Sequence, residues 1–302
     1  MKAAIDIGTN TVLLLVAEVD EGRVVPVFEA HRSPRLGKGV DADRNINDAA
    51  TGRVIAALKE YREILEDRFG QIENIIVTAT SAVRDASNRE EFIEKVRKET
   101  GFKIRLLTGR EEAEWTAAGA LSVVEADVEE VMILDIGGGS TEVALLKQGS
   151  VIDAHSFDMG SVRFTERFLI SVPPAKEEVA NCRKAASDLY NTHVFNPSGN
   201  FKAVGVAGTL TSLAGIRLGL DKYEPNKINN YLLKQNDIND VIEAFMDYPH
   251  EELLDKHPVY LAGRSDIFMA GMLILEGFLK SYGLSEILVS TGGIRHGAIL
   301  KT

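Results

Sequence analysis

The residues with the clearest chemical meaning lie in one short segment near the middle of the chain. Three glycines, Gly137, Gly138 and Gly139, are followed by Ser140 and Thr141, so one point of the chain offers several backbone N–H donors and two hydroxyl groups. Glycines that directly follow a strand let backbone N–H groups approach an anion closely. The segment therefore predicts a phosphate-binding loop.

Two carboxylates flank this loop, Asp135 at the expected strand end and Glu142 one turn later. Carboxylate oxygens are the ligands that Mg²⁺ prefers, often together with the phosphate oxygens of a substrate. The chain carries 34 Lys and Arg against 45 Asp and Glu, a net charge of −11, and so lacks the overall field of a nucleic-acid-binding protein. We therefore expect Mg²⁺ or Mn²⁺ at these acids to help the protein bind a polyanion.

The same motif occurs a second time near the N-terminus. Residues 6–11, Asp-Ile-Gly-Thr-Asn-Thr, align without gaps with residues 135–140, Asp-Ile-Gly-Gly-Gly-Ser. In both copies a short apolar strand precedes the motif, and two strands separated by a tight turn follow it. A plain hairpin explains one such motif as well as a binding loop does, but two copies in matching contexts favour binding loops.

Strands and helices alternate through both halves of the chain, which predicts a mixed α/β sheet in each half. The expected strands are 2–5, 12–19, 23–30, 75–79, 104–107, 131–134, 142–146, 151–157, 203–207 and 287–290. The expected helices are 49–69, 88–100, 110–124, 174–190, 209–218, 236–246, 265–281 and 294–300. We infer two similar α/β domains with a cleft between them.

Composition limits the setting in which the protein works. A hydrophobic content of 45% with 26% charged residues is typical of soluble globular proteins. The apolar stretch 267–279 is shorter than the ~20 residues that a membrane span needs. Asp6 stands where an export signal would need an apolar core. We expect a cytoplasmic protein with neither a nucleic-acid nor a membrane partner, and leave a homodimer open.

Three segments together, 6–11, 135–142 and 204–209, resemble the phosphate loops of the actin-like superfamily of sugar kinases, Hsp70 and actin. More narrowly, they are similar to the exopolyphosphatase/guanosine pentaphosphate phosphatase family. Supporting segments occur in the order of that family at 35–39, 78–84, 108–113 and 290–295. The resemblance therefore extends over the whole chain.

This resemblance implies a fold and an activity. We expect two actin-like, ribonuclease H-like α/β domains, the first formed by 1–117 with 292–302 and the second by 118–291. The implied activity is that of a phosphoanhydride hydrolase, which releases terminal phosphate from inorganic polyphosphate or from guanosine pentaphosphate. Long members of the family carry a further helical region at the C-terminus, so processivity on long polymers stays open.

The resemblance also implies roles for individual residues. Glu112, the second acid of Glu-Glu-Ala, matches the base that activates a water, and Asp135 and Glu142 match metal-associated acids. Attack of water on a phosphoryl group needs such a base and neutralised charge on the transferring oxygens. The residues expected to contact the substrate phosphates are Thr9, Asn10, Thr11, Arg84, Gly137, Gly138, Gly139, Ser140, Thr141, Gly208, Thr209 and Arg264.

Several of these residues also have a purely structural interpretation. Glu111 and Glu112 both suit the start of a helix, where the helix dipole favours acids, so the assignment of the base rests on the resemblance. Arg84 is otherwise an ordinary surface residue, and Arg264 otherwise precedes the start of a long helix. Ala207 stands where related proteins commonly have a glycine.

Two other functions stay open from the sequence. A sugar or acid kinase of the actin-like type would place an aspartate base after a phosphate loop and would carry a sugar-recognition insert. Neither feature is visible, whereas Glu112 precedes the second loop as the hydrolase family requires. A non-catalytic sensor of polyphosphate or nucleotide would keep its binding and its biological role after Glu112→Gln.

Overall fold

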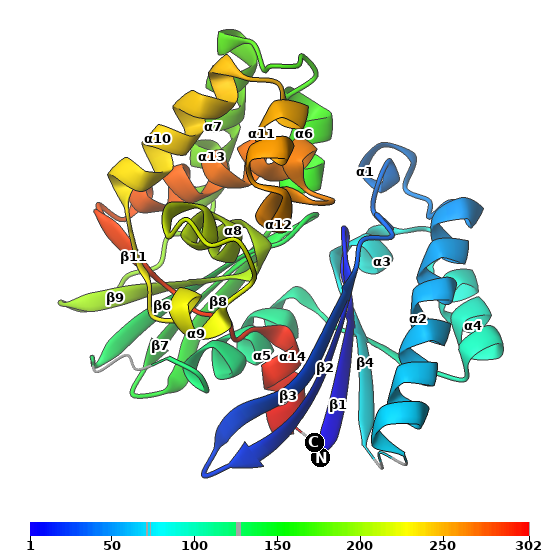
Figure 1. Cartoon of the computed structure of the whole chain (residues 1–302). Helices are drawn as coiled ribbons and strands as arrows, with labels where there is room; N and C mark the ends of the chain where they lie inside the picture. The colour runs from blue at the N-terminus through cyan, green and yellow to red at the C-terminus, as the bar shows by residue number, and fades with distance from the viewer. Residues whose placement is uncertain (71, 73, 125–127, 302) are drawn as a thin grey trace. The chain divides into compact units, whose positions relative to one another are not determined.

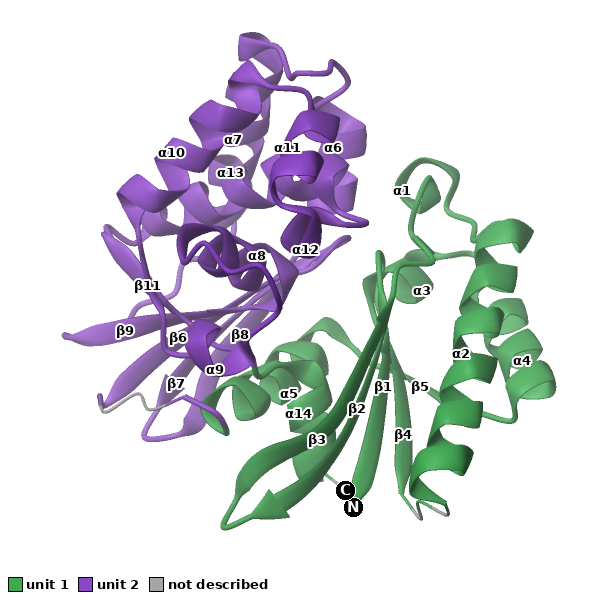
Figure 2. Ribbon diagram, viewed as in Figure 1, with its two compact units in different colours: residues 1–122, 292–302 green, residues 123–291 purple. Residues whose placement is uncertain are grey.

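The computed structural model describes residues 1–70, 72, 74–124 and 128–301 (Figure 1). The chain divides into two compact units, unit 1 with residues 1–122 and 292–302 and unit 2 with residues 123–291 (Figure 2). The domain boundaries proposed from the sequence differ from this division in residues 118–122, at the end of a helix of unit 1. Each unit has its own sheet and its own helices.

Unit 1 is built on a five-stranded sheet with the order β3-β2-β1-β4-β5. Its strands are β1 (Lys2–Ile7), β2 (Val12–Asp20), β3 (Arg23–Arg32), β4 (Ile75–Ala79) and β5 (Ile104–Leu106). The first three strands form an antiparallel meander, and β4 and β5 join β1 in parallel. The helices described in this unit are α1 (Val40–Asp43), α2 (Asp48–Phe69), α3 (Ser81–Asp85), α4 (Arg89–Thr100), α5 (Gly109–Leu121) and α14 (Ile294–Lys301).

Alternating side chains along β1 face two different cores. Ile5 and Ile7 belong to the core that includes buried residues of α2 and α4, because successive side chains of a strand point to opposite faces. Ala4 belongs to the second core, with Trp115 of α5 and residues of α14. Asp6 therefore emerges on the same face of the sheet as Ala4, the face covered by α5 and α14.

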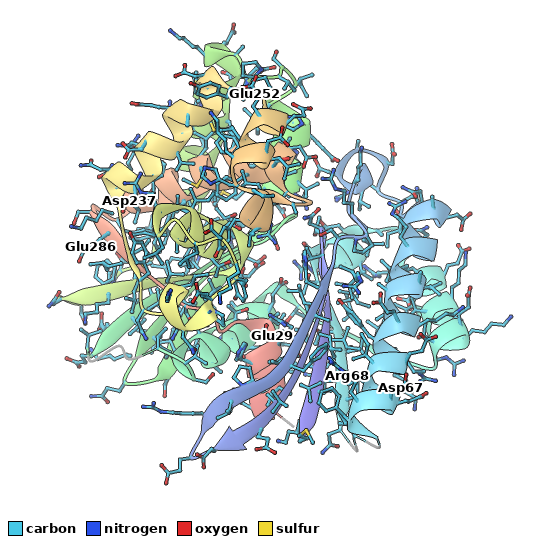
Figure 3. The ribbon with its side chains drawn as sticks, viewed as in Figure 1. Glu29, Asp67, Arg68, Asp237, Glu252 and Glu286 are labelled. Atoms are coloured by element: carbon cyan, nitrogen blue, oxygen red, sulfur yellow. The ribbon has the colours of Figure 1, made fainter. Side chains whose placement is uncertain are left out.

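The helix α14 brings the C-terminal segment back to this face of unit 1. Arg295 donates a hydrogen bond to the carbonyl of Leu14 at 2.9 Å and forms a 2.9 Å ion pair with Glu29. Glu29 projects from β3 in Figure 3. These contacts fix α14 against β2 and β3, next to the end of β1.

Unit 2 has a six-stranded sheet with the order β10-β11-β9-β6-β7-β8. Its strands are β6 (Glu130–Ile136), β7 (Thr141–Lys147), β8 (Ser150–Phe157), β9 (Phe201–Val206), β10 (Leu232–Lys234) and β11 (Glu286–Val289). The helices described in it are α6 (Ser161–Phe168), α7 (Lys176–Tyr190), α8 (Ala207–Arg217), α9 (Pro225–Ile228), α10 (Gln235–Asp247), α11 (His250–Lys256), α12 (Pro258–Leu261) and α13 (Ser265–Ser281). The central helix α13 is apolar on nearly all sides and is buried among the other helices.

The two sheets share one topology, which confirms the internal repeat. The order β3-β2-β1-β4-β5 of unit 1 matches β8-β7-β6-β9-β11 of unit 2, and β10 is added at the edge. A β-bulge interrupts the outer hairpin at the same register in both, after Val16 in unit 1 and after Leu145 in unit 2. A feature as specific as a bulge at equivalent positions indicates one supersecondary unit used twice.

The helices and strands expected from the sequence are present, with ends that differ by at most three residues. The sequence did not predict β10 or the short helices α1, α3, α6, α9, α11 and α12. None of the helices that the structure describes combines the length and the apolar character needed to cross a membrane.

Candidate active site

The glycine-rich loop of unit 2 joins β6 to β7 and is held from one side by α6. The Gly137 N–H donates to the carbonyl of Ser140 at 3.0 Å, which closes a tight turn. The first N–H groups of α6 then bind the loop carbonyls: Ser161 donates to Gly137 at 2.9 Å and Val162 donates to Gly138 at 2.8 Å. The N-terminal donors of this helix are thus used on the loop itself.

The third carbonyl of the loop is bound by a side chain. Arg163 Nε donates to the carbonyl oxygen of Gly139 at 2.6 Å. In a planar trans peptide the N–H of the following residue points opposite to the carbonyl. Because all three loop carbonyls face α6, the N–H groups of Gly138, Gly139 and Ser140 point to the other side. Successive N–H groups directed to one side form an anion-binding nest.

A fourth glycine allows α6 to approach the loop this closely. A Cβ atom at Gly160 would lie 2.5 Å from the carbonyl carbon and oxygen of Gly138. No side chain fits at that distance, so any substitution would push α6 away from the loop. The conformation of the glycine-rich loop therefore depends on a glycine that lies outside the predicted motif.

The two acids expected to hold a metal lie directly opposite each other on β6 and β7. Asp135 pairs with Glu142 in the antiparallel ladder, so both side chains share one face of the sheet. Glu142 is only 2% exposed, and its Oε1 accepts a 2.6 Å hydrogen bond from Ser156 on β8. Among the described residues, no group of three or more His, Cys, Asp or Glu is arranged to hold a metal ion.

A second phosphate-binding candidate lies at the end of the neighbouring strand β9. Asp135 and Val206 are paired in parallel, so α8, which begins directly after β9, starts beside the glycine-rich loop. The guanidinium of Arg264 lies against Gly208, where a Cβ would be 1.9 Å from Nη1, and it donates to Ser212 Oγ at 3.2 Å. A cation at the positive end of a helix is unfavourable unless an anion accompanies it.

The environment of Arg264 also favours an anionic ligand. Burial lowers the pKa of its guanidinium from the ordinary value. In the part of the chain that the structure describes, the Arg264 guanidinium hydrogen-bonds to the Ser212 hydroxyl, and no carboxylate forms an ion pair with it. A buried charge is normally paired, so this residue is suited to a phosphate.

The loop of unit 1 is built in the same way as the loop of unit 2. The Gly8 N–H donates to the carbonyl of Thr11 at 2.9 Å, as Gly137 does in the second copy. The carbonyl of Thr9 accepts a 2.7 Å hydrogen bond from the Gly37 N–H. The carbonyl of Asn10 accepts a 3.0 Å hydrogen bond from the Arg35 N–H. The N–H groups of Asn10 and Thr11 therefore point away from that segment.

Unit 1 also brings Glu112 and Arg84 together. Arg84 Nη1 donates to Glu112 Oε2 at 2.9 Å and to the carbonyl of Leu107 at 3.1 Å. Glu112 is 7% exposed, so this ion pair is largely shielded from water. Arg84 belongs to α3, whose first residue, Ser81, shares a 3.0 Å hydrogen bond with the hydroxyl of Thr9. Glu112, Arg84 and the loop of unit 1 are thus connected by hydrogen bonds through α3.

The neighbouring acid, Glu111, has a structural role. It forms a capping box with Thr108: Thr108 Oγ1 accepts from the Glu111 N–H, and Glu111 Oε2 accepts from the Thr108 N–H at 3.0 Å. The hydrogen bond from the Thr108 backbone, followed by that from Arg105, lowers the pKa of Glu111. The helix-start interpretation is therefore correct for Glu111, while Glu112 points to Arg84 instead.

One buried acid was missed in the sequence, although the repeat identifies it. Asp6 is the equivalent of Asp135 and is 8% exposed. It accepts a 2.9 Å hydrogen bond from Thr78 Oγ1, and burial raises its pKa to about 6. Arg163 and Ser156 were also missed, and no local pattern marks either of them.

The sequence is similar to that of a known protein family. The sequence pattern of the Ppx/GppA phosphatase family matches residues 15–302. The chain belongs to the Ppx/GppA phosphatase family. This confirms the family and the two-domain actin-like α/β fold expected from the motifs.

Relatives in this Ppx/GppA family differ in length and in name. The chain is 30% identical over 314 residues to exopolyphosphatase 2 of Mycobacterium tuberculosis and covers 97% of it. It is 33% identical over 312 residues to a bifunctional 3-dehydroquinate synthase/phosphatase of Fusobacterium nucleatum, of which it spans 46%. The chain therefore spans about half the length of the second protein.

Solved structures of the Ppx/GppA family have the same fold. The Aquifex aeolicus family member has a TM-score of 0.83 at 28% identity, with 99% of this chain and 96% of that chain covered. An exopolyphosphatase from Cytophaga hutchinsonii has a TM-score of 0.86 at 27% identity, with coverage of 99% and 97%.

Proposed function

We propose that this protein is an exopolyphosphatase, which removes terminal orthophosphate from inorganic polyphosphate. The observation that carries this proposal is the loop at 137–140, whose three carbonyls face α6 so that its N–H groups face outward. Backbone donors of this kind bind phosphoryl oxygens and make no contact specific to a base or a sugar. Relatives named exopolyphosphatase or putative exopolyphosphatase in two bacteria support the same activity.

In the proposed reaction, water attacks the terminal phosphorus atom and the bond to the bridging oxygen breaks. Glu112 accepts the proton of the attacking water, and the remaining chain leaves with the electrons of the broken bond. Arg84 holds the Glu112 carboxylate in place through the hydrogen bond from its Nη1. The N–H groups of the 137–140 loop stabilise the charge on the transferring oxygens.

We further propose that Asp135 and Glu142 hold Mg²⁺ or Mn²⁺. Two carboxylates on one face of the sheet, which no further His, Cys, Asp or Glu among the described residues joins in a metal-binding group, fit an ion that completes its shell with water and substrate phosphates. When bound, such an ion neutralises charge on the phosphate chain. The Ser156 hydroxyl fixes the orientation of Glu142 toward that role.

Arg264 and the start of α8 are proposed to bind a neighbouring phosphate of the same chain. The strands β6 and β9 are adjacent and parallel, so the two loops that follow them are one strand spacing apart, about 4.8 Å. Two anion sites at about that spacing suit two phosphates of one linear polymer.

Guanosine pentaphosphate stays a second candidate substrate, because it carries the same terminal phosphoanhydride and the family name includes it. A kinase and a non-catalytic sensor are the remaining alternatives. The experiment is phosphate release, with Mg²⁺, from polyphosphates of defined length, from guanosine pentaphosphate and from ATP, using wild type and Glu112→Gln.

An exopolyphosphatase releases orthophosphate from polyphosphate and loses this activity with Glu112→Gln. If the protein hydrolyses guanosine pentaphosphate in preference to polyphosphate, the substrate is the nucleotide and not the polymer. Phosphate transfer from ATP to an acceptor without hydrolysis would indicate a kinase. Tight polyphosphate binding without any release by wild type would indicate a sensor and overturn the proposal.

A further inference from the structure

We infer that Arg163 is a positioning residue that sets the orientation of the peptide between Gly139 and Ser140, and with it the direction of the Ser140 N–H group. The inference rests on the proposed function, because it assigns this N–H group to the transferring phosphoryl group. Arg163 lies outside the glycine-rich motif, on a helix that the sequence did not predict.

Arg163 contacts the loop through both its backbone and its side chain. Its backbone N–H donates to the carbonyl of Gly138 at 3.1 Å, and its Nε donates to the carbonyl of Gly139 at 2.6 Å. The residue is 6% exposed, so these hydrogen bonds lie away from bulk water. Charge-assisted hydrogen bonds are shorter and stronger than neutral ones, and the Nε contact has that character.

The Arg163 side chain fixes the orientation of the peptide between Gly139 and Ser140, whose carbonyl is not bound by the backbone N–H groups of α6. The carbonyls of Gly137 and Gly138 are bound by backbone N–H groups at the start of α6, and those groups are present whatever the side chains are. The carbonyl of Gly139 is bound by Arg163 Nε. Removing the guanidinium would therefore release one peptide of the three.

A released peptide at this position can rotate. Rotation of the peptide between Gly139 and Ser140 changes ψ of Gly139 and φ of Ser140, and the absence of a Cβ atom on Gly139 removes the steric limit on the first of these two angles. The rotated peptide would direct the Gly139 carbonyl, instead of the Ser140 N–H, toward a bound phosphate. An attractive contact would become a repulsive one, and the effect would be largest when negative charge develops on the transferring oxygens.

An arginine suits this position better than a lysine. The Nε–H bond lies in the rigid plane of the guanidinium and has a fixed direction, whereas a lysine ammonium is a point charge on a flexible stem. Arg163→Lys keeps the charge and most of the stem but lacks a donor at the Nε position. This variant therefore shows whether the positive charge of Arg163 suffices or whether the directed hydrogen bond from its Nε is needed.

The experiment compares Arg163→Lys and Arg163→Met with Arg167→Met, a matched control. Arg167 lies one turn further along α6 and is exposed. For each folded variant, kcat and KM are measured on polyphosphate, together with inhibition by orthovanadate, which mimics the five-coordinate transition state, and by orthophosphate. Melting curves report the stability of each variant.

We expect both Arg163 variants to lower kcat by ~10²–10³-fold, the usual loss for one transition-state donor, with KM within about threefold of wild type. Vanadate inhibition should weaken much more than orthophosphate inhibition. Arg167→Met should behave as wild type. A purely structural role would lower the melting temperature without this difference between vanadate and orthophosphate.

Wild-type kcat in folded Arg163→Lys would overturn the inference, as would equal losses in Arg167→Met. If Arg163→Met does not fold, Arg163→Lys decides alone. A readout without hydrolysis separates this inference from the proposed function: the amide NMR signal of Ser140 should shift on titration with orthophosphate in wild type and not in Arg163→Lys. An unshifted wild-type signal would also overturn the inference, even in an active enzyme.

Discussion

The Arg84 guanidinium donates a hydrogen bond to the Glu112 carboxylate at 2.9 Å, although the two residues are 28 positions apart in the sequence. The contact joins α3, which starts beside the 8–11 loop of unit 1, to the first turn of α5. Arginine and base candidate therefore depend on each other for their positions. Any experiment on one of them also perturbs the other.

Glu112→Gln should lower turnover by ~10²–10⁴-fold, because glutamine keeps the size and polarity of the side chain but cannot accept the proton of water. Binding of polyphosphate should change little. The measurements are steady-state phosphate release and, separately, binding of the polymer by calorimetry.

Glu111→Gln is the matched control for that variant. Glutamine also completes a capping box, so the variant loses only the charge near the helix start and the exposed pair with Arg105, about 1 kcal/mol or less. Turnover should stay close to that of wild type. An inactive Glu111→Gln beside an active Glu112→Gln would place the base one residue earlier.

Arg84→Ala should reduce both substrate binding and turnover, because it removes a cation and also frees the Glu112 side chain. The effects of Arg84→Ala and Glu112→Gln should not add. Contacting residues usually show coupling of ~0.5–3 kcal/mol, so the double variant should be less impaired than the sum predicts. A double-mutant cycle on kcat/KM measures this term, and full additivity would mean that the ion pair has no part in turnover.

Removal of divalent cations should abolish activity, since a chain with a net charge of −11 needs an ion to neutralise a polyanion beside Asp135 and Glu142. Phosphate release should stop in excess EDTA and return with Mg²⁺ or Mn²⁺. Glu142→Gln should need a higher metal concentration for half-maximal rate. Undiminished release in EDTA would exclude a metal from the reaction.

Asp6 predicts a pH-dependent difference in stability. Burial raises its pKa to about 6, above the ordinary value of 3.8, so the folded state keeps the proton that the unfolded state loses between pH about 4 and 6. Wild type is therefore destabilised as the pH rises through that window, by roughly 3 kcal/mol at most.

Asp6→Asn keeps the acceptor for Thr78 but does not ionise. The free energy of unfolding of this variant should be higher than that of wild type at pH 8 and similar to it at pH 4. Denaturant unfolding at both pH values measures the difference, and an equal gain at both would contradict the role of ionisation.

Ala207→Gly should stabilise the protein slightly. Ala207 begins α8 with φ of +67°, a left-handed conformation that costs an L-residue about 1–2 kcal/mol, while glycine adopts it freely but loses more entropy on folding. We expect a net gain of up to ~1 kcal/mol in the free energy of unfolding. The control Ala214→Gly, in the interior of the same helix, should instead destabilise by about 1 kcal/mol or more.

The glycine-rich loop, its equivalent in unit 1, the repeat and the long helices could be predicted from sequence because their signals are local. An aspartate at a strand end followed by glycines defines a loop whatever packs around it, and apolar periodicity defines α2 and α13. The short helix α6 could not be predicted. Its apolar residues Val162 and Phe164 alternate as in a strand, and its eight residues make little over two turns.

The contacts of the candidate site residues depended on tertiary packing. Sequence alone left Glu111 and Glu112 equivalent as acids at a helix start. The structure separates them, because a helix turns by about 100° per residue, so Glu111 reaches back to the cap while Glu112 meets Arg84. Arg163 reaches Gly139 across 24 residues only once α6 has packed on the loop. Local patterns specify where a loop forms, whereas the direction of its N–H groups is decided by the segments that bind its carbonyls.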